Sequence, residues 1–110
     1  MSAEATPAAG AWTRFCPVAE LPPESKKAQR LGSAWVLVCH TEDRYYAVSN
    51  VCSHAARPLT MGRVRHCTIT CPVHGAKFNL ETGAALNLPA TKPIATYPLR
   101  VVDGWIEVLV

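Results

Sequence analysis

The 110-residue sequence has no long apolar run and no basic start followed by a hydrophobic stretch. No segment approaches the about 20 apolar residues that a membrane-spanning helix requires. Residues 1–11 are rich in Ala, Pro, Ser and Thr, whereas a secretory signal peptide has basic residues and then about 7–15 apolar ones. We therefore expect no membrane segment, a flexible tail over residues 1–11 and one folded domain over residues 12–110.

Motifs for nucleotide binding and for hydrolysis are also missing. The chain has no G-x-G-x-x-G or P-loop pattern and no nucleophile–base constellation. Its net charge of +3 is too small to predict nucleic-acid binding. A chain of 110 residues forms one domain and leaves no room for a second, catalytic one. These absences argue against an enzyme acting alone.

No amphipathic helix is evident, so we expect an all-β fold. Alternating or continuous apolar residues between turn signals predict strands. The expected strands cover 12–16, 26–31, 34–40, 45–49, 63–70, 95–102 and 105–110, with one helical turn at 18–21 and short segments 77–80 and 84–86 around a turn. The polar strand 26–31 suits a sheet edge. The tryptophans at 12, 35 and 105 fall in strand patterns and are expected in the core.

Two short motifs dominate the middle of the chain: Cys52-Ser53-His54 and Cys71-Pro72-Val73-His74. Each supplies one thiolate and one imidazole, whereas zinc fingers usually pair cysteines in one half and histidines in the other. Such a set can serve a [2Fe–2S] cluster with both cysteines on one iron and both histidines on the other. A mononuclear zinc site and four unrelated core residues are the alternatives.

The other cysteines and histidines are assigned structural roles. Cys39 lies in an apolar run, and Cys16 and Cys67 adjoin strand-like segments. His40 and His66 have no ligand partner at a suitable spacing and are expected within strands. Free thiols predict a cytoplasmic location.

The flanks of the two motifs resemble the cluster loops of small Rieske ferredoxins. The resemblance is carried by segments 52–62 and 71–80, with Thr82-Gly83 following, and by 88–90 and 97–101; it extends over residues 12–110. It implies a Rieske fold, in which antiparallel sheets carry a small cluster-binding subdomain. It also implies one [2Fe–2S] cluster on Cys52, His54, Cys71 and His74, with the histidines at an exposed tip.

The resemblance further implies a soluble, monomeric one-electron carrier. Such a protein passes electrons from a flavoprotein reductase to the terminal oxygenase of a multicomponent aromatic ring-hydroxylating dioxygenase. Both partners would dock transiently at the histidine edge, whose expected rim is Arg57, Pro58, Val73, Leu88 and Pro89. A small Rieske subunit of an assimilatory nitrite reductase-like enzyme and a zinc-binding structural module remain alternatives.

Charge and polarity near the motifs suggest two further properties. Residues 51–80 contain no acid and four basic side chains, Arg57, Arg63, Arg65 and Lys77. These are either ordinary solvated charges or a docking face for an acidic redox partner. High-potential Rieske proteins resemble one another in carrying Ser and Tyr where this chain has Ala76 and Phe78. The missing hydroxyl donors predict a low reduction potential.

Overall fold

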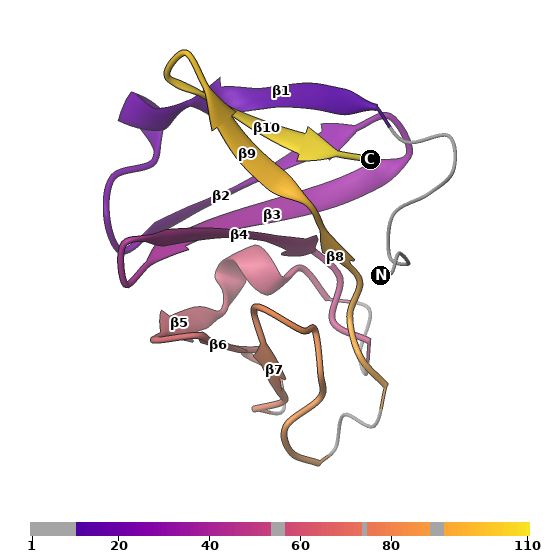
Figure 1. The fold of residues 1–110 in the computed structure, drawn as a ribbon. Helices are drawn as coiled ribbons and strands as arrows, with labels where there is room; N and C mark the ends of the chain where they lie inside the picture. Colours follow the sequence, from indigo (N-terminus) through magenta and orange to yellow (C-terminus); the bar gives the residue numbers. More distant parts are fainter. Residues whose placement is uncertain (1–10, 54–56, 74, 89–91) are drawn as a thin grey trace.

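The computed structural model describes residues 11–53, 57–73, 75–88 and 92–110. The elements are β1 (Trp12–Pro17), η1 (Val18–Glu20), β2 (Ser25–Leu31), β3 (Ala34–Thr41), β4 (Arg44–Ser49), η2 (Leu59–Met61), β5 (Arg63–Arg65), β6 (Thr68–Thr70), β7 (Lys77–Asn79), β8 (Thr96–Tyr97), β9 (Leu99–Val102) and β10 (Trp105–Leu109). They form three antiparallel sheets, ordered β1–β10–β9, β2–β3–β4–β8 and β5–β6–β7 (Figure 1). The prediction of an all-β fold is confirmed. Within the described ranges no helix has the length and apolar character to cross a membrane.

The four-stranded sheet β2–β3–β4–β8, the middle sheet, separates two hydrophobic cores, an upper one toward β1 and β10 and a lower one toward β5–β6–β7. Val36 and Val38 of β3 pack into the upper core with β1 and β10, whereas the alternating Leu37 and Cys39 pack into the lower core. Because both faces of β3 are covered, its sequence is a continuous apolar run rather than an alternating one. The lower core consists of Leu37, Cys39, Val48, Cys52, Leu59, Ile69, Cys71, Ala76, Phe78, Leu80 and Ile94.

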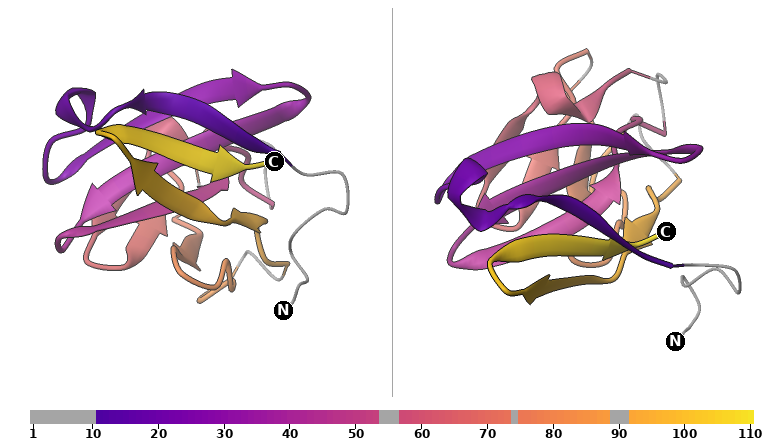
Figure 2. Two further views of the ribbon diagram at one scale, coloured as in Figure 1. Left: turned by 45° about the horizontal axis from the view of Figure 1, so that its top comes forward. Right: turned by 90° about the horizontal axis from the view of Figure 1, so that it is seen from above.

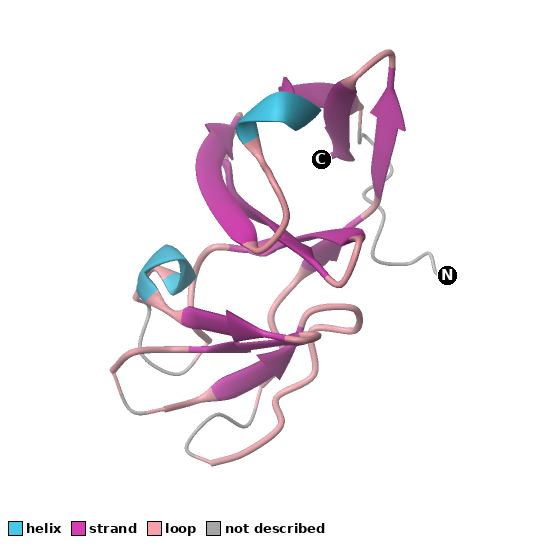
Figure 3. Ribbon diagram, turned by 90° about the vertical axis from the view of Figure 1, so that its left-hand side faces the viewer, coloured by secondary structure: helices cyan, strands magenta, loops and turns pink. Residues whose placement is uncertain are grey.

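Two lobes follow from this division. The sheets β1–β10–β9 and β2–β3–β4–β8 enclose the upper core, and β1 and β10 lie across the middle sheet when seen from above (Figure 2). The lower lobe consists of β5–β6–β7, η2 and the described loop residues between 50 and 94 (Figure 3). Ala11 and Val110 exchange backbone hydrogen bonds of 2.8 and 3.2 Å, so strand pairing continues beyond both β1 and β10.

The strand predictions are confirmed in most places and wrong in three. Strand β2 forms a sheet edge, as expected. The single strand predicted over 95–102 is two strands, because Pro98 interrupts it: β8 pairs with β4 and β9 pairs with β10. Segment 84–86 contributes only an isolated bridge from Ala85 to Phe78. His66 lies in the turn between β5 and β6, with φ at 57°.

The expectation that the three tryptophans are core residues is also wrong. Trp12 is 38% exposed, and Trp35 and Trp105 are half-buried. An arginine guanidinium lies over each ring: Arg100 over Trp12, Arg14 over Trp105 and Arg30 over Trp35, at 4.2, 4.7 and 4.8 Å from the ring centres. Such stacking keeps the indole at the surface while it covers the ring face.

Candidate metal centre

The first loop of the lower lobe starts from Asn50, which is fully buried directly after β4. Its backbone N–H donates to the Trp35 carbonyl at 2.8 Å, and its own carbonyl accepts from Leu59 at 2.9 Å. Its side-chain Oδ1 accepts from the N–H and the hydroxyl of Thr60, at 2.8 and 2.6 Å. Asn50 therefore joins the loop's beginning and its end at η2 to the middle sheet. Its Nδ2 has no hydrogen-bond partner among the described residues.

The second loop connects β6 to β7 and is fixed at Gly75 and Lys77. Gly75 has φ at +75°, a conformation that glycine adopts without strain. Asn87, farther along the chain, accepts from the Lys77 N–H at 2.7 Å and donates from Nδ2 to the Gly75 carbonyl at 3.1 Å. Neither Asn50 nor Asn87 was singled out from the sequence, where each resembles an ordinary loop residue.

Cys52 and Cys71 occupy equivalent positions in the two loops. The Cys52 N–H donates to the Arg57 carbonyl at 2.8 Å, and the Cys71 N–H donates to the Ala76 carbonyl at 2.7 Å. In each loop the acceptor lies five positions after the cysteine. Both cysteines are buried, at 0% and 1% exposure, and both belong to the lower core. The structure thus brings the two predicted cysteines together from segments far apart in the sequence.

The two loops and the segment after them are held against one another. A Cβ placed on Gly62 would lie 2.2 Å from the Thr70 carbonyl oxygen, so the end of the first loop touches the residue before Cys71. The Ser53 hydroxyl donates to the Lys92 carbonyl at 2.6 Å and ties the first loop to the segment that leads into β8. The predicted histidine ligands, His54 and His74, lie outside the described residues.

A model of the Rieske [2Fe–2S] domain matches residues 11–98, which is most of the chain. The protein belongs to the Rieske family. Its cofactor is accordingly a Rieske-type [2Fe–2S] cluster, and the prediction of this cofactor is confirmed. The alternative of a zinc-binding structural module is set aside by the same match.

Named relatives place this Rieske protein beside small electron-transfer subunits. It is 38% identical over 91 residues to the 3-phenylpropionate/cinnamic acid dioxygenase ferredoxin subunit of Shigella flexneri, covering 81% of this chain and 84% of that one. A chain in the complex of reduced oxygenase and oxidized ferredoxin of carbazole 1,9a-dioxygenase matches with a TM-score of 0.82 and 30% identity, over 88% of this chain and 91% of that one.

A second kind of relative has the same fold. The putative NADH-dependent nitrite reductase small subunit from Mycobacterium tuberculosis matches with a TM-score of 0.82 and 25% identity, over 92% of this chain and 96% of that one.

Cys52 and Cys71, the two predicted ligands that lie among the described residues, fit a Rieske cluster. Thiolates are the ligands that iron–sulfur clusters take from proteins, and here two cysteines lie buried at the starts of two matched loops. Loops closed by backbone hydrogen bonds and in contact through Gly62 and Thr70 can hold two such ligands at a fixed separation. Among the described residues alone, no three His, Cys, Asp or Glu side chains gather into a metal site.

The remaining described cysteines and histidines lie outside the two ligand loops, although Cys39 of β3 belongs to the same lower core as Cys52 and Cys71. Burial raises the pKa of the Cys39 thiol to about 12, and it raises that of Cys16 as well, as is typical of structural thiols packed in a core. Cys67 and His66 precede β6, at the opposite end from Cys71, about 13 Å along the strand. His40 lies within β3, as predicted, with Nδ1 at 2.8 Å from the Leu21 carbonyl.

Proposed function

We propose that this Rieske protein is a one-electron carrier that passes electrons from a flavoprotein reductase to the terminal oxygenase of a multicomponent aromatic ring-hydroxylating dioxygenase. The observation that carries the proposal is the 38% identity to a dioxygenase ferredoxin subunit over 84% of that protein's length. In this proposal residues 12–110 act as a single domain, and the protein is not an enzyme by itself. The same relatives support a ferredoxin that meets its oxygenase as a separate protein.

The proposed ligand set is Cys52, His54, Cys71 and His74. When bound, the cluster accepts and releases one electron at a time. Cys52 and Cys71 would hold the iron nearer the lower core, because both are buried there. His54 and His74 follow these cysteines by two and three positions and would hold the other iron toward solvent. The histidine edge is then the shortest route for electrons to and from a partner.

Exposed apolar side chains support docking at this edge. Of the seven large hydrophobic residues exposed within the described ranges, four belong to the lower lobe: Met61, Val73, Leu86 and Leu88. Val73 directly precedes His74, and Leu88 is 78% exposed. From the proposed rim, Arg57 is also exposed and Pro58 is half-buried, while Pro89 lies outside the described residues. A rim that is partly apolar and mostly uncovered suits a brief contact between a monomeric carrier and each partner in turn.

A cytoplasmic location is part of the proposal. Cys16, Cys39 and Cys67 are free thiols in the structure. Thiols stay reduced in the cytoplasm, whereas oxidising compartments favour disulfides.

A second candidate function is that of a small nitrite reductase subunit. The match to the Mycobacterium tuberculosis protein favours it, since both chains are covered almost entirely. The two functions differ in how the protein is held: a ferredoxin must leave its reductase to reach an oxygenase, whereas a subunit stays with its enzyme.

Stopped-flow spectroscopy of the cluster tests the proposal. Purified holoprotein is mixed with candidate flavoprotein reductases and NADH, and the reduced protein is then mixed with candidate oxygenases, their aromatic substrates and oxygen. We expect reduction by one class of partner and reoxidation by the other, with the carrier monomeric in sedimentation. Stable co-purification with a nitrite-reducing flavoprotein, and no oxidation by any oxygenase, would overturn the ferredoxin assignment.

A further inference from the structure

The sheet β5–β6–β7 has an apolar inner face and a basic outer face. Its register aligns Val64, Ile69 and Phe78 across the three strands, and these residues pack on the lower core. Side chains alternate between the faces of a strand, so the neighbouring row, Arg63, Thr70 and Lys77, lies on the outer face. Arg65, two residues after Arg63, lies on the same face.

The three cations of this face have no acidic partner among the described residues. Within the described ranges Arg63, Arg65 and Lys77 are exposed and form no ion pair within 4.0 Å. The chain contains no Asp or Glu between Asp43 and Glu81. The sheet's own strands therefore provide no negative charge to neutralise their outer face.

One acid, Glu24, lines the same groove as these cations, and it is engaged with residues outside the sheet, as is its neighbour Glu42. Glu24 accepts from the Thr41 hydroxyl through Oε1 at 3.4 Å and from the Glu42 N–H through Oε2 at 3.2 Å. Glu42 in turn has Oε2 at 2.7 Å from His66 Nδ1. Neither carboxylate is paired with Arg63, Arg65 or Lys77.

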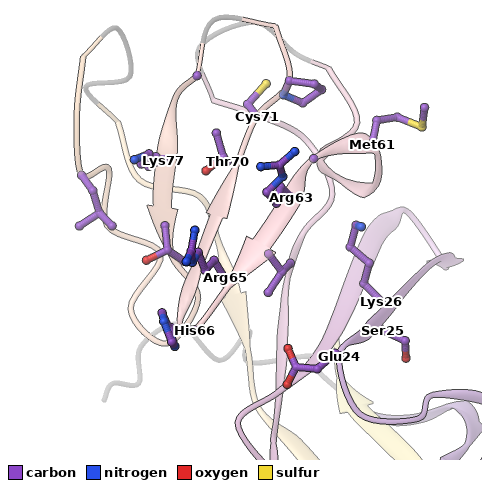
Figure 4. A pocket seen from close by; sticks show the side chains of 16 residues that line it. Glu24, Ser25, Lys26, Met61, Arg63, Arg65, His66, Thr70, Cys71 and Lys77 are labelled. Atoms are coloured by element: carbon purple, nitrogen blue, oxygen red, sulfur yellow. The ribbon is translucent and has the colours of Figure 1, made fainter.

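The basic face forms one wall of an open groove (Figure 4). Lys26, from the edge strand β2, and Met61, from η2, lie on the other side, and Cys71 lies at the end opposite His66. The groove therefore runs along the sheet to the second ligand loop. Met61 and Leu86, which are 75% and 50% exposed, add apolar surface to it.

We propose that this groove, lined by Lys26, Arg63, Arg65 and Lys77, is a docking surface for an acidic segment on the surface of a redox partner protein. The identity of the occupant as a redox partner rests on the proposed function; its acidic character rests on the unneutralised cations. Thr70 immediately precedes Cys71, so a partner bound here is held next to the cluster loop. Complementary charge mainly raises the rate of encounter, which suits a carrier that must meet and leave its partners.

The lining of the groove favours a protein over a nucleic acid. Single-stranded nucleic acids are bound by basic grooves that also carry aromatic stacking platforms. No Phe, Tyr or Trp side chain is among the described residues that line this groove. Methionine and leucine at its margins are instead the kind of apolar contact found in protein interfaces.

A fluorescein-labelled decaglutamate peptide serves as the acidic probe, with its binding to holoprotein followed by fluorescence anisotropy. In low salt, the triple variant Arg63→Gln, Arg65→Gln, Lys77→Gln should bind about tenfold more weakly than the parent. The control Arg14→Gln, Lys27→Gln, Arg100→Gln removes the same total charge from elsewhere and should bind within about twofold of the parent. Equal loss in both triple variants would reduce the effect to net charge and overturn the proposal.

Two further arms complete the test. Thr70→Glu keeps every cation but places an acid between Arg63 and Lys77, and it should also weaken peptide binding. An oligouridylate of ten nucleotides should compete no better than unlabelled peptide, and markedly tighter RNA binding would overturn the assignment to a protein partner. Peptide binding needs no electron transfer, so the surface can be confirmed even when no oxygenase accepts electrons from the cluster.

Discussion

The outer faces of the two three-stranded sheets have the same arrangement of cations and different residues at the centre. In β1–β10–β9, Glu107 of the central strand pairs with Arg14 on one side and Arg100 on the other. In β5–β6–β7, Thr70 of the central strand pairs with Arg63 and Lys77. One face therefore carries its own counter-charge, and the other does not.

The neutralised face is organised as a connected surface. Glu107 is only 12% exposed at its side chain, with Oε1 at 2.7 Å from Arg100 Nε and Oε2 at 4.0 Å from Arg14 Nε. Each arginine also covers a tryptophan ring. The strands of the lower sheet have three residues each, and among the described residues none of its cations pairs with an acid or lies over an aromatic ring. We therefore expect the upper lobe to be stabilised within the chain, and the lower lobe to gain more of its stability from the cluster and to leave its charge available to a partner.

Removing proposed ligands tests this dependence most severely. Changing Cys52 or Cys71 to Ser, or His54 or His74 to Ala, should abolish or badly degrade the cluster, because each change removes one of the four proposed ligands that join the two loops through the metal. Hydrogen exchange should then rise in β5–β7 and change little in β1 and β10. Iron and sulfide analysis, visible spectra and amide exchange of each variant measure these effects.

The matched controls are the thiols outside the pair. Cys16→Ser, Cys39→Ser and Cys67→Ser should keep the iron–sulfur spectrum, since two of these thiols are core groups with raised pKa and the third lies beyond the far end of β6. Loss of the spectrum in any of the three would mean that the ligand set has been assigned wrongly.

Two glycine substitutions distinguish the effect of close packing between the ligand loops from the effect of backbone strain in a distant turn. Gly62→Ala would place a Cβ 2.2 Å from the Thr70 carbonyl and push the two loops apart, at a cost of about 2–3 kcal/mol and with a lower iron content. Gly32→Ala has open space but a φ of +63°, so it should cost about 1–2 kcal/mol without loss of iron. Denaturant unfolding and iron per protein are the measurements. Equal iron content in both variants would contradict the role given to Gly62.

The sequence predicts the strands and the cysteine loops because their signals are local. Turn residues, the continuous run over 34–40 and the spacing of Cys52 and Cys71 can each be recognised within short windows. The placement of Thr70 between two cations depends on strand register across three separate segments. Asn50 was missed for a similar reason, since its hydrogen bonds to Trp35 and Thr60 span distant elements. The roles of His54 and His74 remain predictions.

The reduction potential of the cluster should respond to hydroxyl groups added in the lower core but not to one added in the upper core. Hydroxyl donors to cluster sulfur favour the reduced, more negative state, so their absence predicts a potential in the low part of the range of about −150 to +300 mV. Ala76→Ser with Phe78→Tyr should raise it by roughly 50–150 mV if both hydroxyls reach a sulfur, since 59 mV corresponds to about 1.4 kcal/mol. Both residues are buried in the lower core.

Phe15→Tyr is the control, because Phe15 is buried in the upper core and its new hydroxyl would lie far from the ligand loops. Protein-film voltammetry should give it the parent potential. A parent value well above zero, or an equal shift in the control, would defeat the hydrogen-bond explanation.

The smallest effect should come from exchanging the central residues of the two outer faces. Thr70→Glu supplies the missing acid between Arg63 and Lys77, and a charge pair across strands is worth about 0.2–1 kcal/mol, so holoprotein should become slightly more stable to urea. Glu107→Thr should lose a similar amount of stability or somewhat more, because the Glu107 side chain is 12% exposed and its carboxylate pairs with two arginines.

The controls Thr70→Gln and Glu107→Gln place a side chain of the size of glutamate at each position without its charge. Both effects should shrink between about 10 and 150 mM salt, as the screening length falls from about 30 to 8 Å. If Thr70→Glu and Thr70→Gln are equally stable at low salt, the cations of the lower sheet are already well solvated and the two faces do not differ in the way that their registers indicate.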